Sequence, residues 1–292
     1  KQRMKYLLSI LVVVTGCSDS EIEQPVAVQD TKSAPWFEEV SNTIGVDHTY
    51  FSGAKGNYNI IETMGGGAAL FDFDNDGDLD LYITQGNNLQ GALLATLQNK
   101  LYENVHGSFE ERTIIDDSRY SIGVTSGDYN NDGFVDLYIT NFGRNTLLKN
   151  NGDGSFEDVT VIAGVGEGAF SACAEFADID LDGDLDLFVT NYLDWTPETE
   201  KACFSEQNRR DYCNPSSYDS PIADTLYFNN GDGTFTNVSE QSGIASIAGT
   251  GLGLAIAPMN DDNLPDIFVA NDGMPDRLWI NEGDGTFTES AM

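Results

Sequence analysis

The chain has 292 residues, with 48 Asp and Glu against 14 Lys and Arg, which gives a formal net charge of −34. Such a chain repels phosphates and anionic lipid headgroups, because binding either one needs clustered basic side chains. We therefore expect no nucleic-acid partner. Hydrophobic residues make up 40% and charged residues 21%, which is too apolar for a disordered acidic tail. The 30 glycines and the many Asp and Asn residues predict short strands joined by tight turns rather than a helical bundle.

Residues 1–16 are predicted to be a lipoprotein signal peptide. Lys5 precedes an apolar run over residues 6–14 and a small-residue exit at Thr15-Gly16-Cys17. The run is too short to cross a hydrocarbon core about 30 Å thick, but it has the organisation of a secretory signal. The end of the run resembles the bacterial lipobox, which implies cleavage before Cys17 and lipidation of its thiol. The alternative is an ordinary signal with a chance cysteine.

The predicted location is the bacterial cell envelope. Ser18 after the cysteine resembles signals that are sorted to the outer membrane, so we expect an outer-membrane lipoprotein held to the membrane only by its N-terminal lipid. Residues 17–35 are polar, contain Pro25 and Pro35 and have no apolar periodicity. They are predicted to be a flexible tether. The folded domain is expected over residues 36–292.

Three further cysteines follow the tether. Cys203 and Cys213 bracket a short polar segment, and in an oxidising export compartment a disulfide between them is the natural prediction. A zinc site is less favoured, because no second Cys or His pair lies nearby in the sequence. Cys173 is expected to be a small buried residue rather than a reactive thiol.

Internal repetition is the strongest feature of the sequence. An Asp-rich element followed by an apolar run recurs four times, the fourth copy being degenerate. An Asn-Gly-Asp-Gly element and a Phe-x-x-Val element followed by Gly recur between these copies. The Asp-rich copies span 72–84, 128–140, 178–190 and 258–270; the Asn-Gly-Asp-Gly copies include 151–156, 230–235 and 282–287; and the Phe-x-x-Val copies span 37–46, 156–165 and 235–244.

The repeats predict an all-β fold, a β-propeller. Apolar runs rich in β-branched and aromatic residues, such as 81–83 and 187–189, are typical of strands buried on both faces. Asn-Gly and Asp-Gly favour hairpin turns. Each unit is thus expected to be a four-stranded antiparallel sheet, repeated around an axis. The longer third interval predicts an insertion over residues 194–221 that carries the cysteine pair.

The propeller is expected to be incomplete in this chain. Four repeats supply whole blades, whereas residues 36–46 resemble the last strand of a blade without its other strands. An open arc leaves sheet edges and one blade face uncovered. We therefore expect a free face on the last blade.

The Asp-rich loops predict calcium sites. Oxygen ligands at loop positions 1, 3, 5 and 9, a backbone carbonyl at position 7 and Gly at position 6 suit one hard cation. Position 12 is Ile83, Ile139 or Val189 rather than Glu, so these loops are not EF-hands. Solvated turns without an ion are the alternative, but they would leave like charges unpaired. The predicted ligands are Asp72, Asp74, Asp76, Asp78 and Asp80; Asp128, Asn130, Asp132, Phe134 and Asp136; Asp178, Asp180, Asp182, Asp184 and Asp186; and, more weakly, Asn260, Asp262, Leu264 and Asp266.

The four loops are predicted to bind calcium unequally. The formal side-chain charge at positions 1, 3, 5 and 9 is −4, −3, −4 and −2 in loop order. In the fourth loop Pro258 offers no side-chain oxygen at position 1, and Asn263 replaces the glycine. Because affinity depends on carboxylate count and rigidity, we expect three ions held well and a fourth held weakly or not at all.

These residues resemble a known group of repeats. The loops are similar to the FG-GAP/VCBS repeats of integrin α heads. The order of the segments 62–72 and 191–195, the Asn-Gly-Asp-Gly turns and Tyr212-Cys213 resembles the narrower cartilage acidic protein/UnbV (ASPIC) family. In that family a longer propeller precedes a small C-terminal domain, so the resemblance implies that this chain corresponds to the N-terminal portion.

No catalytic constellation is predicted, and we expect the chain not to be an enzyme. His48 and His106 lie beside no nucleophile motif, and Gly65–Gly67 precedes a strand rather than a helix. Trp195 is the best aromatic candidate for ligand contact. The favoured function is a calcium-stabilised adhesion module that binds another protein or an extracellular glycan. The alternative is part of a polysaccharide-active envelope enzyme, with catalytic residues in the insertion or beyond the C-terminus.

Overall fold

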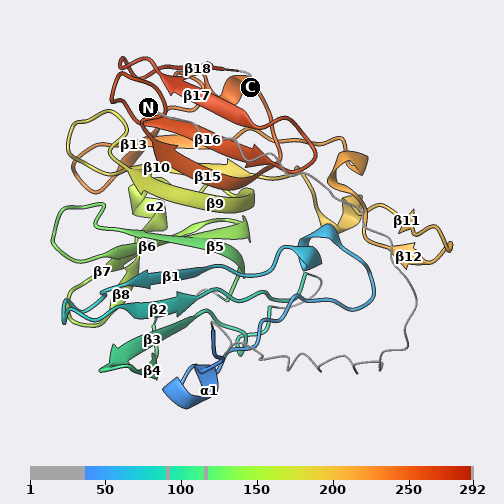
Figure 1. The fold of residues 1–292 in the computed structure, drawn as a ribbon, viewed down its shortest axis with the longest axis horizontal. Coiled ribbons are helices and arrows are strands. Elements are labelled where there is room, and N and C mark those ends of the chain that lie inside the picture. The colour runs from blue at the N-terminus through green and yellow to red at the C-terminus, as the bar shows by residue number, and fades with distance from the viewer. Residues whose placement is uncertain (1–36, 90–92, 115–117, 291–292) are drawn as a thin grey trace, which may run out of the picture. The chain divides into compact units, whose positions relative to one another are not determined.

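Four blades of antiparallel strands follow one another along the chain (Figure 1). The computed structural model describes residues 37–89, 93–114 and 118–290. The predicted signal peptide, Cys17 and the tether lie outside these residues. The chain divides into two compact units, residues 1–39 and 40–292, and the sheets all belong to the second. No helix in the described part is long and apolar enough to span a membrane.

Each blade has four strands paired in chain order, which is the arrangement of a propeller blade. A short pairing at Phe142–Phe170 and Gly143–Ala169 joins the second and third blades into one eight-stranded sheet. The first blade holds β1 (Ala68–Phe71), β2 (Asp80–Ile83), β3 (Lys100–Val105) and β4 (Ser108–Arg112). The second holds β5 (Tyr120–Gly127), β6 (Asp136–Gly143), β7 (Thr146–Asn150) and β8 (Phe156–Asp158). The third holds β9 (Ala169–Ala177), β10 (Asp186–Asn191), β13 (Thr225–Asn229) and β14 (Phe235–Asn237). The fourth holds β15 (Gly251–Ala257), β16 (Asp266–Asn271), β17 (Arg277–Asn281) and β18 (Phe287–Glu289).

Short elements connect the strands. They are the helices α1 (Ser41–Ile44) and α2 (Thr160–Ala163), the 3₁₀ turns η1 (Ile60–Thr63), η2 (Pro197–Thr199), η3 (Pro215–Ser217) and η4 (Ile244–Ser246), and the two-residue strands β11 (Cys203–Phe204) and β12 (Arg210–Asp211). The last two belong to the insertion in the third blade. The predicted all-β class is confirmed.

The core lies between successive blades. Tyr82 of the first blade packs in one cluster with Leu137 of the second, and Tyr138 of the second packs with Leu187 of the third. Phe188 of the third blade and Trp279 of the fourth share a further cluster. Every residue of β10 is buried, because a blade covers each face of its sheet. This explains the continuous apolar runs in the sequence.

The fourth blade is covered less completely than the third. Where β10 is buried throughout, only half of the residues of β16 are buried. The innermost strands β1, β5, β9 and β15 are neighbours in that order. The described residues therefore form an incomplete propeller with an open face on its last blade, as predicted.

Glycines allow the innermost strands to approach closely. A Cβ on Gly67 would lie 3.0 Å from the Cα of Gly123, and a Cβ on Gly123 would lie 2.5 Å from the carbonyl oxygen of Ala172. Any larger residue would therefore push the blades apart. Gly67, the last glycine of the Gly-Gly-Gly segment, thus serves packing between the innermost strands.

The prediction of a strand over residues 36–46 is wrong for the residues that the structure describes. Residues 37–40 form no strand, and α1 follows them and ends at Gly45 with φ of 92°. No partner strand for this segment is present among the described residues, and pairing is what makes a strand. The turn that follows is nevertheless repeated: Gly45, Gly164 and Gly243 each pack against the carbonyl oxygen of a Phe in the last strand of a blade.

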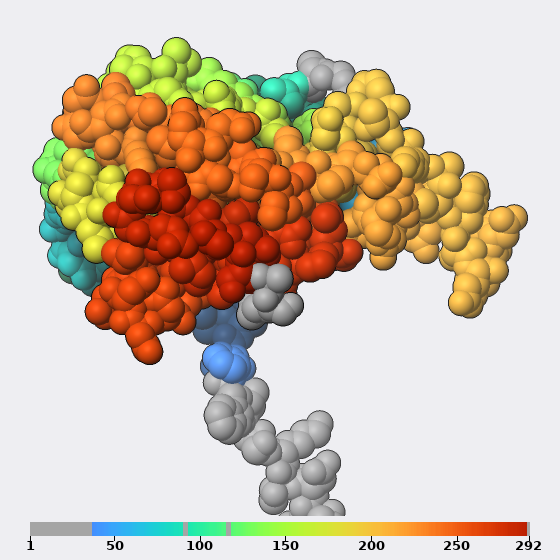
Figure 2. Space-filling view, turned by 90° about the horizontal axis from the view of Figure 1, so that it is seen from above, coloured from blue at the N-terminus to red at the C-terminus, as the bar shows by residue number. Residues whose placement is uncertain are grey.

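The insertion over residues 194–221 forms an arm that projects from the blades (Figures 1 and 2). Cys203 and Cys213 are joined by a disulfide with Cα atoms 5.2 Å apart. The base of the arm is fixed to the segment before β1, where Tyr212 donates a hydrogen bond to Glu62 (3.0 Å) and the Ile60 N–H donates to Glu200 (3.0 Å). The insertion of the third blade thus reaches the start of the first.

Candidate metal centres and the insertion end

The Asp-rich loops lie at one end of the propeller, between the first and second strands of each blade. In the first loop the Asp72 carboxylate accepts hydrogen bonds from the N–H groups of Asp76 (3.1 Å) and Gly77 (3.0 Å). Gly77 has φ of 94°, which a side chain would disfavour. The second loop repeats these bonds around Asp128. The spacing of the repeat therefore folds the first two loops around their first aspartates.

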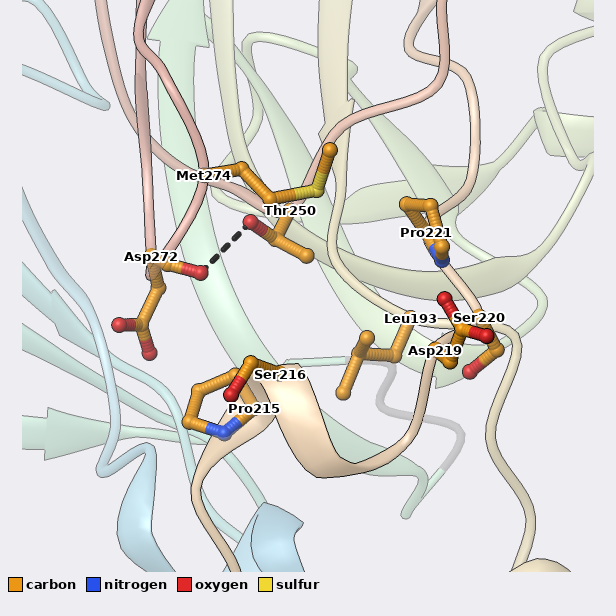
Figure 3. Close-up of a pocket in the computed structure, with 9 residues that line it drawn as sticks. All are labelled: Leu193, Pro215, Ser216, Asp219, Ser220, Pro221, Thr250, Asp272 and Met274. Atoms are coloured by element: carbon orange, nitrogen blue, oxygen red, sulfur yellow. Dashed lines mark hydrogen bonds between the residues drawn. The ribbon is translucent and has the colours of Figure 1, made fainter.

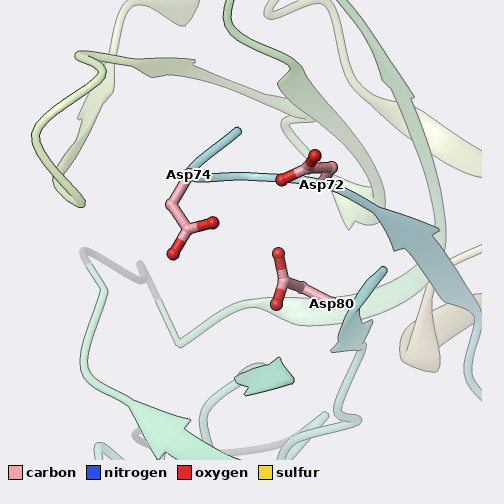
Figure 4. Close-up of side chains that lie close together, drawn as sticks. All are labelled: Asp72, Asp74 and Asp80. Atoms are coloured by element: carbon pink, nitrogen blue, oxygen red, sulfur yellow. The ribbon is translucent and has the colours of Figure 1, made fainter. Parts of the chain in front are cut away.

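The first loop gathers three carboxylates (Figure 4). One oxygen from each of Asp72, Asp74 and Asp80 lies within 4.8 Å of the others. Burial raises the pKa of Asp74, and the neighbouring carboxylates of Asp76 and Asp72 raise it further. Three carboxylates so close together repel one another, and this repulsion favours binding of a hard cation. Calcium prefers such oxygen donors.

The third loop gathers Asp178, Asp180 and Asp182 in the same way, again within 4.8 Å. The Oδ1 atom of Asp178 is buried and has no hydrogen-bond partner. Burial raises the pKa of Asp180, and Asp182 adds to the increase. An oriented, unpartnered carboxylate oxygen among other acids fits a cation ligand.

The second and fourth loops are poorer in charge. In the second, Asn130 takes the place of an acid and its amide nitrogen donates to Asp136 at 3.3 Å. In the fourth, the oxygen of Asn260 accepts from the N–H of Asp262 (2.7 Å), and Asn263 adopts φ of 65° at the position where the other loops have Gly. Within the described residues, neither loop brings three carboxylates together.

The acid at loop position 9 also has a structural role, which the sequence did not reveal. Asp136 and Asp186 are fully buried, and each accepts two backbone N–H bonds. For Asp186 the donors are Ile179 and Asn229, both at 2.9 Å. Burial raises the pKa of Asp136 and of Asp186 to about 7. This carboxylate therefore ties the loop to the third strand as well as facing the loop interior.

An asparagine at the end of the third strand links each of the last three blades to the blade before it. The side-chain amide of Asn150 donates to the carbonyl oxygen of Phe73 in the preceding blade (2.7 Å). Asn229 donates in the same way to Tyr129 (2.8 Å), and Asn281 donates to Ile179 (3.0 Å). Each acceptor is position 2 of an Asp-rich loop, so the second, third and fourth blades each hold the loop of the blade before. The only sequence signal is the Asn that precedes each Asn-Gly-Asp-Gly-type turn.

Adjacent loops also touch each other directly. The Asn75 side chain donates to the Gly133 carbonyl oxygen (2.9 Å), and Asn131 donates to the carboxylate of Asp184 (2.6 Å). Leu181 holds the corresponding position of the third loop. The first three loops thus form a contiguous row of acids and amides.

The opposite end of the propeller contains the insertion and the cavities next to it. A cavity of about 470 Å³ at the axis is lined by residues of all four innermost strands or their starts, including Ala68, Ile122, Cys173 and Leu252. Burial raises the pKa of the Cys173 thiol, which is half-buried there. Trp195, expected as a ligand contact, is 3% exposed and donates its indole N–H to Glu200. The tryptophan packs beneath the insertion and lines a separate cavity of about 220 Å³, so ligand contact by Trp195 stays a prediction.

Comparison with known proteins agrees with the repeat pattern. The FG-GAP-like repeat family matches residues 72–139 and 128–189, which include the first three Asp-rich loops. The chain contains FG-GAP-like repeats. It is also similar to cartilage acidic protein 1 of Homo sapiens, at 22% identity over 91% of this chain and 39% of the relative. For the Xenopus tropicalis protein the identity is 23% over 89% of this chain and 39% of the relative. The predicted resemblance is confirmed, and the chain spans about two fifths of these relatives.

Solved structures share only a general likeness with the chain. A lectin of Agrocybe aegerita that recognises non-reducing terminal N-acetylglucosamine aligns with a TM-score of 0.39 and 17% identity over 77% of this chain and 51% of its own. An exotype rhamnogalacturonan lyase aligns with a TM-score of 0.36 and 13% identity over 78% of this chain and 46% of its own. At such scores neither protein bears on the function of this one.

Proposed function

We propose that this FG-GAP-like repeat chain is a calcium-binding module of the bacterial cell envelope that binds a protein or an extracellular glycan without catalysing a reaction. The observation that carries the proposal is the grouping of three carboxylates in each of two loops at one end of the blades. In such loops the acidic residues serve as metal ligands and supply neither a catalytic nucleophile nor a general acid. The repeat family and the similarity to cartilage acidic protein 1 support a binding module.

Calcium would be held by the acids at positions 1, 3, 5 and 9 and by the backbone carbonyl at position 7. When bound, the ion supplies positive charge that offsets carboxylate repulsion and fixes the loop. The fit rests on the gathered oxygens of Asp72, Asp74 and Asp80 and on the unpartnered Oδ1 of Asp178. The role of the metal is therefore structural.

The arm is the part of the chain best placed to meet a partner. It projects from the blades (Figure 2), and Phe204 on it is 59% exposed. Exposed aromatic side chains on a braced element are typical contact residues at interfaces. We assign partner contact to the insertion end and metal binding to the loop end.

Export and lipid attachment are part of the proposal. They rest on residues 1–17, and a disulfide in the arm fits an oxidising compartment. Labelling of the expressed protein with radioactive palmitate tests the anchor. We expect label in the native chain and none in Cys17→Ser, and label that persists in the variant would contradict the anchor.

A binding screen tests the function. The full chain would be applied to arrays of envelope glycans and to separated envelope proteins, with calcium and with chelator. We expect calcium-dependent capture that falls at least tenfold in Phe204→Ser. The matched control is Val161→Ser on α2, since Val161 is 74% exposed and lies outside the insertion. Turnover of a glycan by the purified chain would overturn the proposal.

A further inference from the structure

A small cavity of about 190 Å³ lies between the base of the insertion and the fourth blade (Figure 3). Pro215 and Pro221 come from the insertion, Leu193 precedes it, and Met274 follows β16. These four side chains supply apolar walls. The cavity is smaller than the roughly 300–1,000 Å³ of pockets for drug-sized ligands. Its size suits a single side chain.

The charged groups of this cavity are acidic. Asp219 and Asp272 lie on opposite sides of it in Figure 3. The hydroxyl of Tyr192 donates to one carboxylate oxygen of Asp272 at 2.9 Å, which fixes the orientation of the acid. The hydroxyl of Thr250 donates to the Asp272 carbonyl oxygen at 2.8 Å. The hydroxyl of this threonine is therefore already used as a donor within the protein.

The lining excludes several ligand classes. It contains no Lys, Arg or His, so a carboxylate or phosphate would meet two acids without a counter-charge. It also contains no aromatic side chain on which a sugar ring could stack. A ligand with an apolar stem and a cationic end satisfies both the walls and the two acids.

We propose that this cavity receives the side chain of a lysine or arginine from a partner protein. The inference rests on the proposed function as a binding module and names its partner as a protein with an exposed basic residue. The formal charge of −34 attracts such a partner over distance. A buried side chain in a pocket then serves as the anchor of the interface.

A methionine inside the cavity makes the test specific. Met274 lines the cavity, so a ¹³C-labelled methyl group on it reports occupancy by NMR, with its signal assigned from Met274→Leu. The probe is the capped peptide Gly-Lys-Gly, titrated into the full chain at saturating calcium and physiological salt so that the acidic loops are occupied and screened. We expect a saturable shift of the Met274 signal, and no shift with the norleucine peptide of equal length.

Paired variants distinguish the effect of the two cavity acids from the effect of the overall negative charge of the chain. We expect at least a tenfold weaker affinity in Asp219→Asn with Asp272→Asn, a pair in which the new amide oxygen at position 272 still accepts from Tyr192. The control is Asp153→Asn with Asp232→Asn, which removes the same charge from two exposed turns near the loop end. Equal weakening in both pairs would overturn the inference, as would equal binding of the norleucine peptide, a shift caused by N-acetylglucosamine instead, or no shift with lysine.

Failure of this inference is distinguishable from failure of the proposed function. If the inference alone is wrong, the native chain still captures glycans or proteins in the binding screen and the Asp219/Asp272 pair captures them equally well. If the proposed function is wrong, the native chain captures nothing in that screen.

Discussion

The two ends of the propeller are built by different means. At the loop end most contacts within a loop are short in sequence, such as the Asp76 N–H to Asp72, four residues apart. At the insertion end Tyr212 reaches Glu62 across 150 residues and Ile60 reaches Glu200 across 140. The loop end is repeated in every blade, whereas the insertion occurs once. Repetition thus makes a regular scaffold with acidic loops, and a single insertion gives it an individual surface.

Calcium removal should have the largest effect, and it should act mainly at the loop end. An ion bound only by the native state adds about 4.1 kcal/mol at a free concentration a thousandfold above its Kd. We expect chelation to lower the melting temperature strongly and to leave the arm folded. Calorimetry measures the first effect, and limited proteolysis of the arm measures the second. An unchanged melting temperature would contradict the metal assignment.

Loss of one inter-blade asparagine should cost less than loss of all the ions. Asn229 is 7% exposed and donates to Tyr129 and Leu185 while accepting from Gly231. We expect Asn229→Ala to lower the free energy of unfolding by about 3 kcal/mol, because two buried carbonyls and one N–H lose their partner. The adjacent, exposed Asn230→Ala is the control for urea denaturation. Similar losses in the two variants would show that the inter-blade bonds do not stabilise the fold.

The disulfide should affect the insertion end alone. Closing a ring of this size lowers the conformational entropy of the unfolded arm. In the chain-entropy account this stabilises the folded arm by about 3 kcal/mol. We expect Cys203→Ser with Cys213→Ser to speed tryptic cleavage after Arg209 and Arg210, while the melting temperature of the blades stays unchanged. Cleavage at the native rate, or a concerted loss of blade stability, would argue against an independent arm.

The smallest expected effect is the difference in calcium binding between two of the Asp-rich loops. Asp74→Ala removes one of three gathered acids, whereas Asp262→Ala acts in a loop that gathers fewer. We expect the first change to abolish one strong calcium site in a titration and to lower calcium-dependent stability by about 1–3 kcal/mol. The second should change either quantity little. Equal losses would remove the ranking of the loops.

The sequence was most informative where structure is local. The blade strands, the hairpin turns and the acids that gather at Asp72, Asp74 and Asp80 follow from spacing and turn chemistry. The cross-blade role of Asn229 was not predictable, because its partner lies 100 residues away. The burial of Trp195 was not predictable either, because it depends on Glu200 and on packing against Phe170. A strand at residues 37–40 would need a partner strand, and the local sequence pattern does not show whether one is present.

The bonds from later blades to the loops before them make the completion of a loop depend on the next blade. The loop at 72–80 has its own turns, but the carbonyl of Phe73 gains its partner only when Asn150 has folded into the second blade. The loop at 128–136 waits likewise for Asn229, about a hundred residues later. If these loops bind calcium as proposed, each site would be completed only once the following blade has folded.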